Sequence, residues 1–158
     1  MRSAGLTAVV VLVLDLLTKH LALGRLPPAR PVHVIDGFFS LTLVMNPGLA
    51  FGMLAGTPAG WRWLVAVLSI GALAVLAVVG LRMLPTGGRL TPLALGLIFG
   101  GAVGNLIDRA RFGAVVDFLD FYWRGYHWPA FNVADASISV GVVVLALRML
   151  SAPPSASR

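Results

Sequence analysis

Two long stretches without a charged residue restrict the possible folds of this chain more than any other feature. Residues 63–81 form a run of nineteen and residues 90–107 a run of eighteen. A helix of nineteen residues is about 28 Å long, which is roughly the thickness of the hydrocarbon core of a bilayer. Apolar residues make up 58% of the sequence and charged residues 11%, too few to cover a soluble domain. The chain is therefore predicted to be an integral membrane protein.

Two further apolar stretches lie near the ends of the sequence and contain only a few charged residues. The fold class predicted is an α-helical integral membrane protein with four transmembrane helices at about 3–23, 62–82, 90–107 and 130–150. They form a single transmembrane domain over residues 1–150, followed by a Ser- and Pro-rich tail at 151–158 that is expected to be disordered. A cleavable signal peptide is the alternative for the first span, but Asp15 and Lys19 inside it argue against that interpretation.

The segment between the first two spans contains a β-hairpin signal. Residues 32–35 and 38–44 are rich in β-branched and aromatic residues, and Asp36-Gly37 separates them. Asp-Gly between two such runs is typical of a tight hairpin turn. We therefore expect a small extracytoplasmic β-hairpin or sheet in the first outer loop. In the third span, Gly96, Gly100 and Gly104 form a stripe of small residues that suits close helix packing.

Charge distribution indicates the orientation in the membrane. Four spans place both termini on one side, where the short segments carry five Arg and no acidic residue. The long segments, 24–62 and 108–129, carry six Arg and four Asp. The raw counts of basic residues do not decide the orientation, but their density per residue is higher on the short-loop side, which favours cytoplasmic termini.

Several residue types are missing, and their absence excludes several kinds of site. The sequence has no Cys and no Glu, and its three His show no ligand spacing, so neither a metal nor another cofactor is expected. The net charge of +6 comes from scattered Arg, which does not suggest a nucleic-acid surface. Ser69, Ser137 and Ser139 have no Lys or His base nearby in the sequence, so a Ser nucleophile is a poor candidate.

Asp117 and Asp135 are the strongest candidates for chemistry, because each is embedded in apolar sequence. An Asp at the bilayer centre costs about 2.5–3.5 kcal/mol to insert, so an intramembrane carboxylate is a functional candidate. Two adjacent carboxylates share a proton and can activate a water, which is the chemistry of aspartyl proteases. Asp120 is interpreted as structural, since Arg124 lies four residues further on and can pair with it.

Three other motifs allow a structural and a functional reading. Asp15 and Lys19 are four residues apart on a helix, so they form either a simple ion pair or part of a polar site. Residues 46–52, Asn-Pro-Gly-Leu-Ala-Phe-Gly, suit a tight turn. Residues 104–109 place Asn, Asp and Arg in one turn at the end of the third span, where an ordinary helix end needs only one polar group.

Taken together, five sequence blocks resemble the lipoprotein signal peptidase family, also called signal peptidase II. The blocks are DLLTK at 15–19, NPGLAF at 46–51, GGAVGNLIDR at 100–109, GAVVDF at 113–118 and WPAFNVAD at 128–135. They occur in the order of the family, and the resemblance extends over about residues 3–150. It implies an intramembrane aspartyl endopeptidase that removes signal peptides from bacterial prolipoproteins, cutting before a diacylglyceryl-modified cysteine.

The resemblance also implies roles for particular residues. Asp117 and Asp135 correspond to the catalytic dyad, and the supporting positions are Asp15, Lys19, Asn46, Gly48, Asn105, Asp108, Arg109, Asn132 and Ala134. The partners implied are diacylglyceryl-modified prolipoproteins and membrane lipid, and the protein is expected to be a monomer. The expected location is the bacterial cytoplasmic (inner) membrane, as a multi-pass protein with the active site near the outer leaflet.

Two functions of other classes stay open on the sequence alone. A proton-coupled transporter or channel would also carry Asp and Lys inside its spans, but it predicts polar groups at both membrane faces. A non-catalytic assembly partner would use the glycine stripe and the polar pairs for packing. The second function gives no reason for two carboxylates and two asparagines at one depth.

Overall fold

The structure is a computed structural model that describes residues 2–28, 30–48, 62–83, 88 and 90–150. In this part of the chain, four helices and four strands follow one another. The helices are α1 (Arg2–Arg25), α2 (Arg62–Met83), α3 (Leu90–Phe112) and α4 (Val133–Leu150). The strands are β1 (Val32–Ile35), β2 (Phe39–Asn46), β3 (Val115–Trp123) and β4 (Tyr126–His127). The side chains of residues 62–66 and 83 and the predicted tail at 151–158 lie outside the described part.

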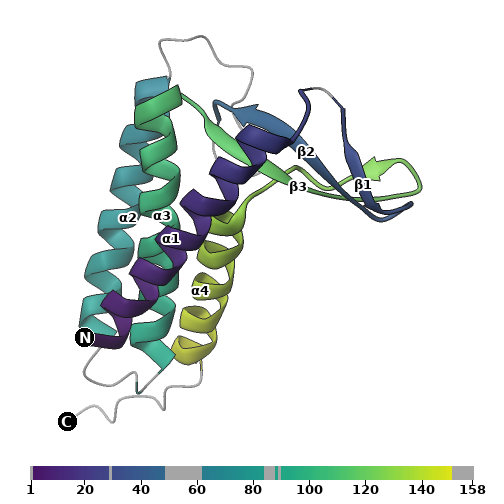
Figure 1. The fold of residues 1–158 in the computed structure, drawn as a ribbon. Coiled ribbons are helices and arrows are strands. Elements are labelled where there is room, and N and C mark those ends of the chain that lie inside the picture. Colours follow the sequence, from purple (N-terminus) through teal and green to yellow (C-terminus); the bar gives the residue numbers. More distant parts are fainter. Residues whose placement is uncertain (1, 29, 49–61, 84–87, 89, 151–158) are drawn as a thin grey trace, which may run out of the picture.

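Helix α3 is the centre of the bundle and packs against α1, α2 and α4 (Figure 1). Its glycines allow the close approach that the small-residue stripe predicts. A Cβ atom at Gly96 would lie 2.6 Å from the carbonyl oxygen of Ala4, and one at Gly100 would lie 2.5 Å from that of Ala8. Real Cβ atoms do not come this close to a backbone oxygen, so the backbones of α1 and α3 can approach this closely only where α3 has glycine.

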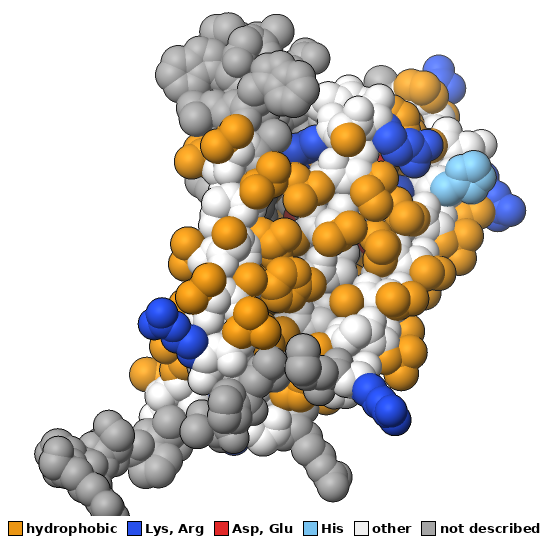
Figure 2. All heavy atoms as spheres, turned by 90° about the vertical axis from the view of Figure 1, so that its left-hand side faces the viewer, with side chains coloured by type: hydrophobic (Ala, Val, Ile, Leu, Met, Phe, Trp, Pro, Cys, Tyr) orange, Lys and Arg blue, Asp and Glu red, His pale blue; other side chains and the backbone are white. Residues whose placement is uncertain are grey.

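The outer surface of the bundle is apolar, as a lipid environment requires. Helices α1, α3 and α4 are each long and apolar enough to cross a membrane, whereas the apolar part of α2 with described side chains covers only Val67–Arg82. Hydrophobic side chains cover the middle of the face shown in Figure 2, and basic side chains lie toward its two ends. The chain is therefore a multi-pass membrane protein, and the predicted fold class, helices with a small sheet, is confirmed.

The four strands form one antiparallel sheet in the order β1-β2-β3-β4. The predicted hairpin is β1–β2, and its turn contains Gly37 at φ 75°, a backbone conformation that glycine adopts without strain. Strands β3 and β4 were not predicted, because their segment was interpreted only as a loop between two spans. Strand β3 pairs with β2 from Asn46 opposite Val115 to Phe39 opposite Phe121, so the two long inter-helix segments form a single sheet.

Two helix ends differ from the predicted spans by more than two residues, and both differences affect polar residues. Helix α3 continues past 107 to Phe112, which places Asp108 and Arg109 inside the helix. It ends at Gly113, where φ is 69° and the backbone N–H donates to the carbonyl of Arg109 at 2.9 Å. Helix α4 begins at Val133 rather than 130, because Asn132 caps it.

The sheet lies at one end of the bundle and projects sideways from it (Figure 1). The start of α1 and the end of α4 lie at the opposite end of the bundle. Strands β2 and β3 and the first turn of α4 therefore meet beside the same ends of α1 and α3. This junction between the sheet and the helices contains the polar residues singled out by the sequence.

Candidate active site

Six buried polar side chains, together with the equally buried Asn46 of β2, meet at the junction between the sheet and the bundle. Each of them is at most 7% exposed, although they lie in or beside helices that are otherwise apolar. Buried polar groups need partners, since an unpaired one loses its hydrogen bonds to water without compensation. The six residues belong to α1, α3, β3 and the start of α4, and they are Asp15, Lys19, Asn105, Asp108, Asp117 and Asn132.

Asp117 is the third residue of β3 and is 1% exposed. Its Oδ1 accepts a hydrogen bond from Nδ2 of Asn132 at 2.7 Å, and its Oδ2 accepts one from Nδ2 of Asn46 at 2.9 Å. Both donors are uncharged amides. Burial, and next the negative charge of Asp135, raise the pKa of Asp117 to about 7. This carboxyl group can therefore take up and release a proton near neutral pH.

Asp135 lies in the first turn of α4 and shares a partner with Asp117. Its Oδ1 accepts a hydrogen bond from Nδ2 of Asn105 at 2.8 Å, and its Oδ2 accepts the backbone N–H of Asn132 at 3.3 Å. In return, the backbone N–H of Asp135 donates to Oδ1 of Asn132 at 2.9 Å. This reciprocal pair is a capping box. Asn132 thus contacts both carboxyl groups, that of Asp117 through its side-chain amide and that of Asp135 through its backbone N–H, and it holds them at the same corner of the site.

The orientation of two amides follows from donors that cannot reverse. The backbone N–H of Gly48 donates to Oδ1 of Asn46 at 2.9 Å, as that of Asp135 does to Oδ1 of Asn132. A backbone N–H can only donate, so both amide oxygens point away from Asp117 and both NH2 groups point toward it. Asp117 is consequently held by two donors whose direction is fixed by the backbone.

Lys19 of α1 is 2% exposed and contacts three acceptors. Its Nζ lies 2.8 Å from Oδ2 of Asp15 and 2.9 Å from Oδ2 of Asp108, and it donates to Oδ1 of Asn105 at 2.9 Å. The ion pair predicted between Asp15 and Lys19 is confirmed, but it is one part of a larger network. An ammonium group has three N–H donors, and each of them has an acceptor here.

The two carboxylates that contact Lys19 also accept backbone N–H groups. Oδ1 of Asp15 accepts the N–H of Ala134 at 2.9 Å, and Oδ2 of Asp108 accepts the N–H of Val116 at 3.1 Å. These bonds give partners to buried N–H groups at the start of α4 and of β3. Ala134 itself is 0% exposed. Asp108 therefore links α3 to the strand.

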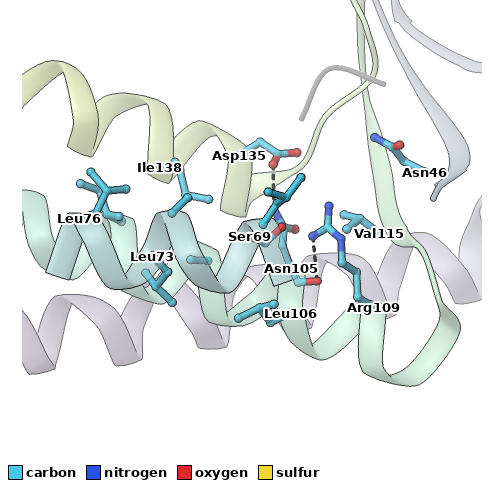
Figure 3. A pocket seen from close by; sticks show the side chains of 14 residues that line it. Asn46, Ser69, Leu73, Leu76, Asn105, Leu106, Arg109, Val115, Asp135 and Ile138 are labelled. Carbon is cyan, nitrogen blue, oxygen red and sulfur yellow. Dashed lines mark hydrogen bonds between the residues drawn. The ribbon is translucent and has the colours of Figure 1, made fainter. Parts of the chain in front are cut away.

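A cavity of about 460 Å³ opens beside these residues. Figure 3 shows its polar end, where Asp135, Asn105, Arg109 and Asn46 lie, and its apolar end among the helices. Arg109 donates from Nη2 to the carbonyl of Gly48 at 2.8 Å and from Nη1 to that of Asn105 at 3.3 Å. Asp117 is not one of the lining residues, but Asn46, which is one, donates to its carboxyl group. The remaining lining side chains come mainly from α2, α3 and α4, and include Leu68, Ser69, Leu73, Leu76 and Ile138.

The α2 wall of this cavity is a part of the site that the sequence reasoning did not identify. Helix α2 is apolar almost throughout, so nothing in its sequence separates side chains that face the cavity from those that face lipid. In the part of the chain that the structure describes, no three His, Cys, Asp or Glu side chains are grouped as metal ligands. The polar side chains among the lining residues are one carboxyl group (Asp135), two amides (Asn46 and Asn105), the guanidinium group of Arg109 and the hydroxyl group of Ser69.

The partner predicted for Asp120 is wrong. Asp120 accepts a hydrogen bond from Ser40 at 3.0 Å and lies 2.9 Å from Nδ1 of His127, whereas the guanidinium group of Arg124 lies over the ring of Trp123. Spacing by four residues brings side chains together on a helix, but on a strand it separates them by about 13 Å. Residues 115–123 form a strand, so the helical pairing rule did not apply.

Comparisons with known proteins agree on one family. Residues 7–151 match the family described as Signal peptidase (SPase) II. The Lipoprotein signal peptidase of Geobacter sulfurreducens is 50% identical over 139 residues, which are 88% of this chain and 86% of that protein. That of Desulforapulum autotrophicum is 47% identical over 147 residues, 92% of this chain and 90% of that protein. A solved bacterial membrane enzyme aligns over 100% of this chain and 93% of its own, with a TM-score of 0.77 at 29% identity.

Proposed function

The chain belongs to the signal peptidase II family of membrane proteases, and we propose that it cleaves prolipoproteins before the cysteine that carries diacylglyceryl. In this proposal Asp117 and Asp135 are the catalytic residues. The observation that carries it is their shared partner Asn132, which contacts both carboxyl groups in a buried corner beside the cavity. Two carboxyl groups at one buried site share a single proton, and that state permits acid and base catalysis at once.

The proposed reaction needs only the two aspartates and a water. The ionised carboxylate takes a proton from the water as the water oxygen bonds to the scissile carbonyl carbon, and the protonated partner gives its proton to the carbonyl oxygen. The tetrahedral intermediate then collapses. Its carbon–nitrogen bond breaks, and the released amine takes the proton that the first carboxylate had accepted from the water. One hydroxyl group of the intermediate returns its proton to the other carboxylate, so the signal peptide leaves with a new carboxyl group and the dyad again holds one proton. No covalent intermediate with the protein forms.

The other polar residues support this chemistry by orientation. Asn46 and Asn132 present fixed N–H donors to Asp117, and Asn105 does the same for Asp135. Arg109 donates to the carbonyl of Gly48, which holds the chain after β2 against the polar end of the cavity. Side chains locked by such bonds keep reacting groups in place, and a displacement of about 1 Å can cost about 10²-fold in rate.

The apolar part of the cavity suits the hydrophobic segment of a signal peptide. It is open between membrane-spanning helices, so a substrate anchored in the bilayer reaches the polar end without leaving the membrane. A lipid-modified cysteine stays near the membrane surface, and the junction of bundle and sheet lies at one end of the helices. We place this junction at the outer leaflet of the bacterial cytoplasmic membrane, with both termini cytoplasmic and residues 1–150 acting as a monomeric catalytic domain.

Cleavage of a defined substrate tests the proposed function. Purified protein is incubated with a diacylglyceryl-modified prolipoprotein and, in parallel, with the same protein lacking the lipid, and the products are analysed by mass spectrometry. We expect one new amino terminus, at the modified cysteine, and far slower cleavage without the lipid. Absence of cleavage would favour the transporter or assembly function, and a cut elsewhere would contradict the assignment of the scissile bond.

Single cysteines test the orientation, because the chain has none of its own. A cysteine at position 89 should react only with a membrane-permeant reagent in intact cells, whereas one between residues 30 and 40 should react with an impermeant reagent. Labelling of position 89 from outside would reverse the topology and place the aspartates at the cytoplasmic face.

A further inference from the structure

The single lysine of the sequence, Lys19, is buried at a point connected to both aspartates. Its Nζ contacts two carboxylates and one amide oxygen at 2.8–2.9 Å. No hydrogen-bond donor in the described residues reaches Oδ2 of Asp15 apart from this ion pair. The ammonium group thus holds three acceptors from α1 and α3 around one nitrogen atom.

Each of the two carboxylates leads to a different catalytic aspartate. Asp15 accepts the backbone N–H of Ala134, the residue before Asp135, and Asp108 accepts that of Val116, the residue before Asp117. The two connections have the same form. In each, the ammonium group contacts a carboxylate, and that carboxylate accepts the backbone N–H of the residue before a catalytic aspartate. The backbones that carry the dyad, one on α4 and one on β3, are therefore both tied to Nζ of Lys19.

A third connection reaches Asp135 through its side chain. Oδ1 of Asn105 accepts from Lys19, and because an ammonium group can only donate, this contact fixes the orientation of the amide. Nδ2 of Asn105 then faces Oδ1 of Asp135, to which it donates at 2.8 Å. Nδ2 of Asn132 also donates to Oδ1 of Asn105, at 3.2 Å, so loss of the ammonium group would leave this longer bond to hold the amide oxygen.

We infer that Lys19 is a positioning residue that sets the separation of Asp117 and Asp135, through Asp15, Asp108 and Asn105. This inference rests on the proposed function, since it assigns a role in the chemistry of that pair. The simpler possibility is that Lys19 only neutralises the charges of Asp15 and Asp108. The two possibilities predict different activities for variants that leave the net charge of the Lys19 cluster unchanged.

Two charge-balanced variants separate these possibilities. Lys19→Met combined with Asp108→Asn removes one charge of each sign and retains a side-chain oxygen that can accept the N–H of Val116. Lys19→Arg keeps the positive charge, but a planar guanidinium group cannot reproduce the tetrahedral arrangement of an ammonium group. His20→Met is the matched control, because His20 is the exposed neighbour of Lys19 on the same helix.

The experiment measures kcat and KM for a diacylated prolipoprotein, together with the melting temperature in detergent. We expect both balanced variants to fold and the His20 control to stay within twofold of the wild type. A positioning role predicts that kcat falls about 10²-fold in both balanced variants, with KM changed less than about threefold, because the substrate-binding cavity is retained. The pH above which cleavage declines should also rise in the double variant, because the charge of Lys19 lowers the pKa of Asp117.

Recovery of kcat to within threefold of the wild type in either balanced variant would overturn the inference, and so would a loss confined to KM. Failure of both variants to fold would overturn it as well, since Lys19 would then be required for the fold itself. The same experiment tests the proposed function separately. If the proposed function is wrong, the wild-type protein itself will not cleave the substrate.

Discussion

Asp117 and Asp120 lie three residues apart on β3, and both are buried, at 1% and 7% exposure. Both side chains also reach a residue of the neighbouring strand β2, Asn46 in one case and Ser40 in the other. Their surroundings differ in charge. Asp117 has two neutral amide donors and the like charge of Asp135 nearby, whereas Asp120 has a hydroxyl group and the imidazole of His127.

In the proposed function, this difference separates the catalytic carboxylate, Asp117, from the structural one, Asp120. Both oxygens of Asp120 have a partner that is not a carboxylate, because Nδ1 of His127 lies 2.9 Å from Oδ1 and the hydroxyl group of Ser40 donates to Oδ2 at 3.0 Å. A second carboxylate cannot compensate Asp117, and burial then favours its protonated form near neutral pH. Burial alone is therefore a poor sign of function in this protein, and the charge of the nearest ionisable neighbour is the better guide.

Of the substitutions that test this difference between the two aspartates, Asp135→Asn should have the largest effect. Asp135→Asn keeps size and most hydrogen bonds but cannot donate or accept the catalytic proton, so cleavage should fall at least about 10³-fold. The loss of a like charge should also lower the pKa of Asp117, which makes it resemble a paired aspartate. Cleavage kinetics measure the first effect, and infrared titration of the labelled carboxyl group measures the second.

The double variant Asp117→Asn with Asp135→Asn provides the check on this prediction. Its activity should be barely lower than that of either single variant, because the two groups act as one unit. Independent losses that multiply would show that the two residues do not share a step.

Asn46→Ala should have the next largest effect. It removes the donor to Oδ2 of Asp117 and the acceptor for the N–H of Gly48, so we expect about a 10²-fold loss of activity. The free energy of unfolding should fall by about 1–3 kcal/mol, the usual result of leaving a buried group without its partner. Activity and thermal unfolding are measured on the same preparation, and a loss of activity fully explained by unfolded protein would support the turn interpretation of residues 46–52.

Stability should depend on pH through Asp117. Its pKa is raised to about 7 in the folded protein, above the value of about 3.9 for an unfolded chain. The protonated form therefore stabilises the fold, and this contribution is complete below about pH 4 and is lost as the pH rises to about 7. The loss is on the order of 4 kcal/mol, so the melting temperature should fall over this interval, and cleavage should decline above about pH 7 as the shared proton leaves.

Asp117→Asn is the control for the pH dependence, because Asn has no proton to exchange in this range. Its melting temperature should fall less over the same interval than that of the wild type. An equal slope in the wild type and in this variant would mean that another group causes the pH dependence of stability.

Ser40→Ala should have the smallest effect. It removes one of the contacts of Asp120 but leaves His127 in place, so we expect a loss of about 1 kcal/mol in the free energy of unfolding and activity within twofold of the wild type. Chemical denaturation and cleavage rates measure the two quantities. A large loss of activity without a loss of stability would move the Asp120 cluster into the active site.

The sequence predicted the features that depend on local pattern. Charge-free runs located the helices, Asp-Gly located the β1–β2 turn, and the spacing of Asp15 and Lys19 predicted their ion pair. Each of these follows from neighbouring residues, through membrane thickness, turn conformation or helix geometry. The choice of Asp117 and Asp135 also came from the sequence, because an acid inside apolar sequence is costly and needs a reason.

The features that were missed depend on pairing across the chain. Strand β3 exists because it pairs with β2 in a different inter-helix segment, and its apolar residues did not by themselves exclude a loop. The partners of Asp120, Ser40 and His127, could not be predicted without knowing that residues 115–123 form a strand. Asn132 combines a helix cap with contacts to both aspartates, and Lys19 reaches Asn105, which is 86 residues away. Such contacts leave no local periodicity that a sequence pattern can reveal.

The most direct test of the account compares Asp117→Asn with Asp120→Asn. Both substitutions replace one buried carboxylate of β3 by an amide, so they are matched in size, strand and change of charge. Mass spectrometry of a diacylated prolipoprotein incubated with each folded variant measures the shortened product. The account predicts no detectable product with Asp117→Asn and substantial cleavage with Asp120→Asn. Substantial cleavage by Asp117→Asn, with its melting temperature intact, would contradict the assignment of Asp117 to the catalytic pair.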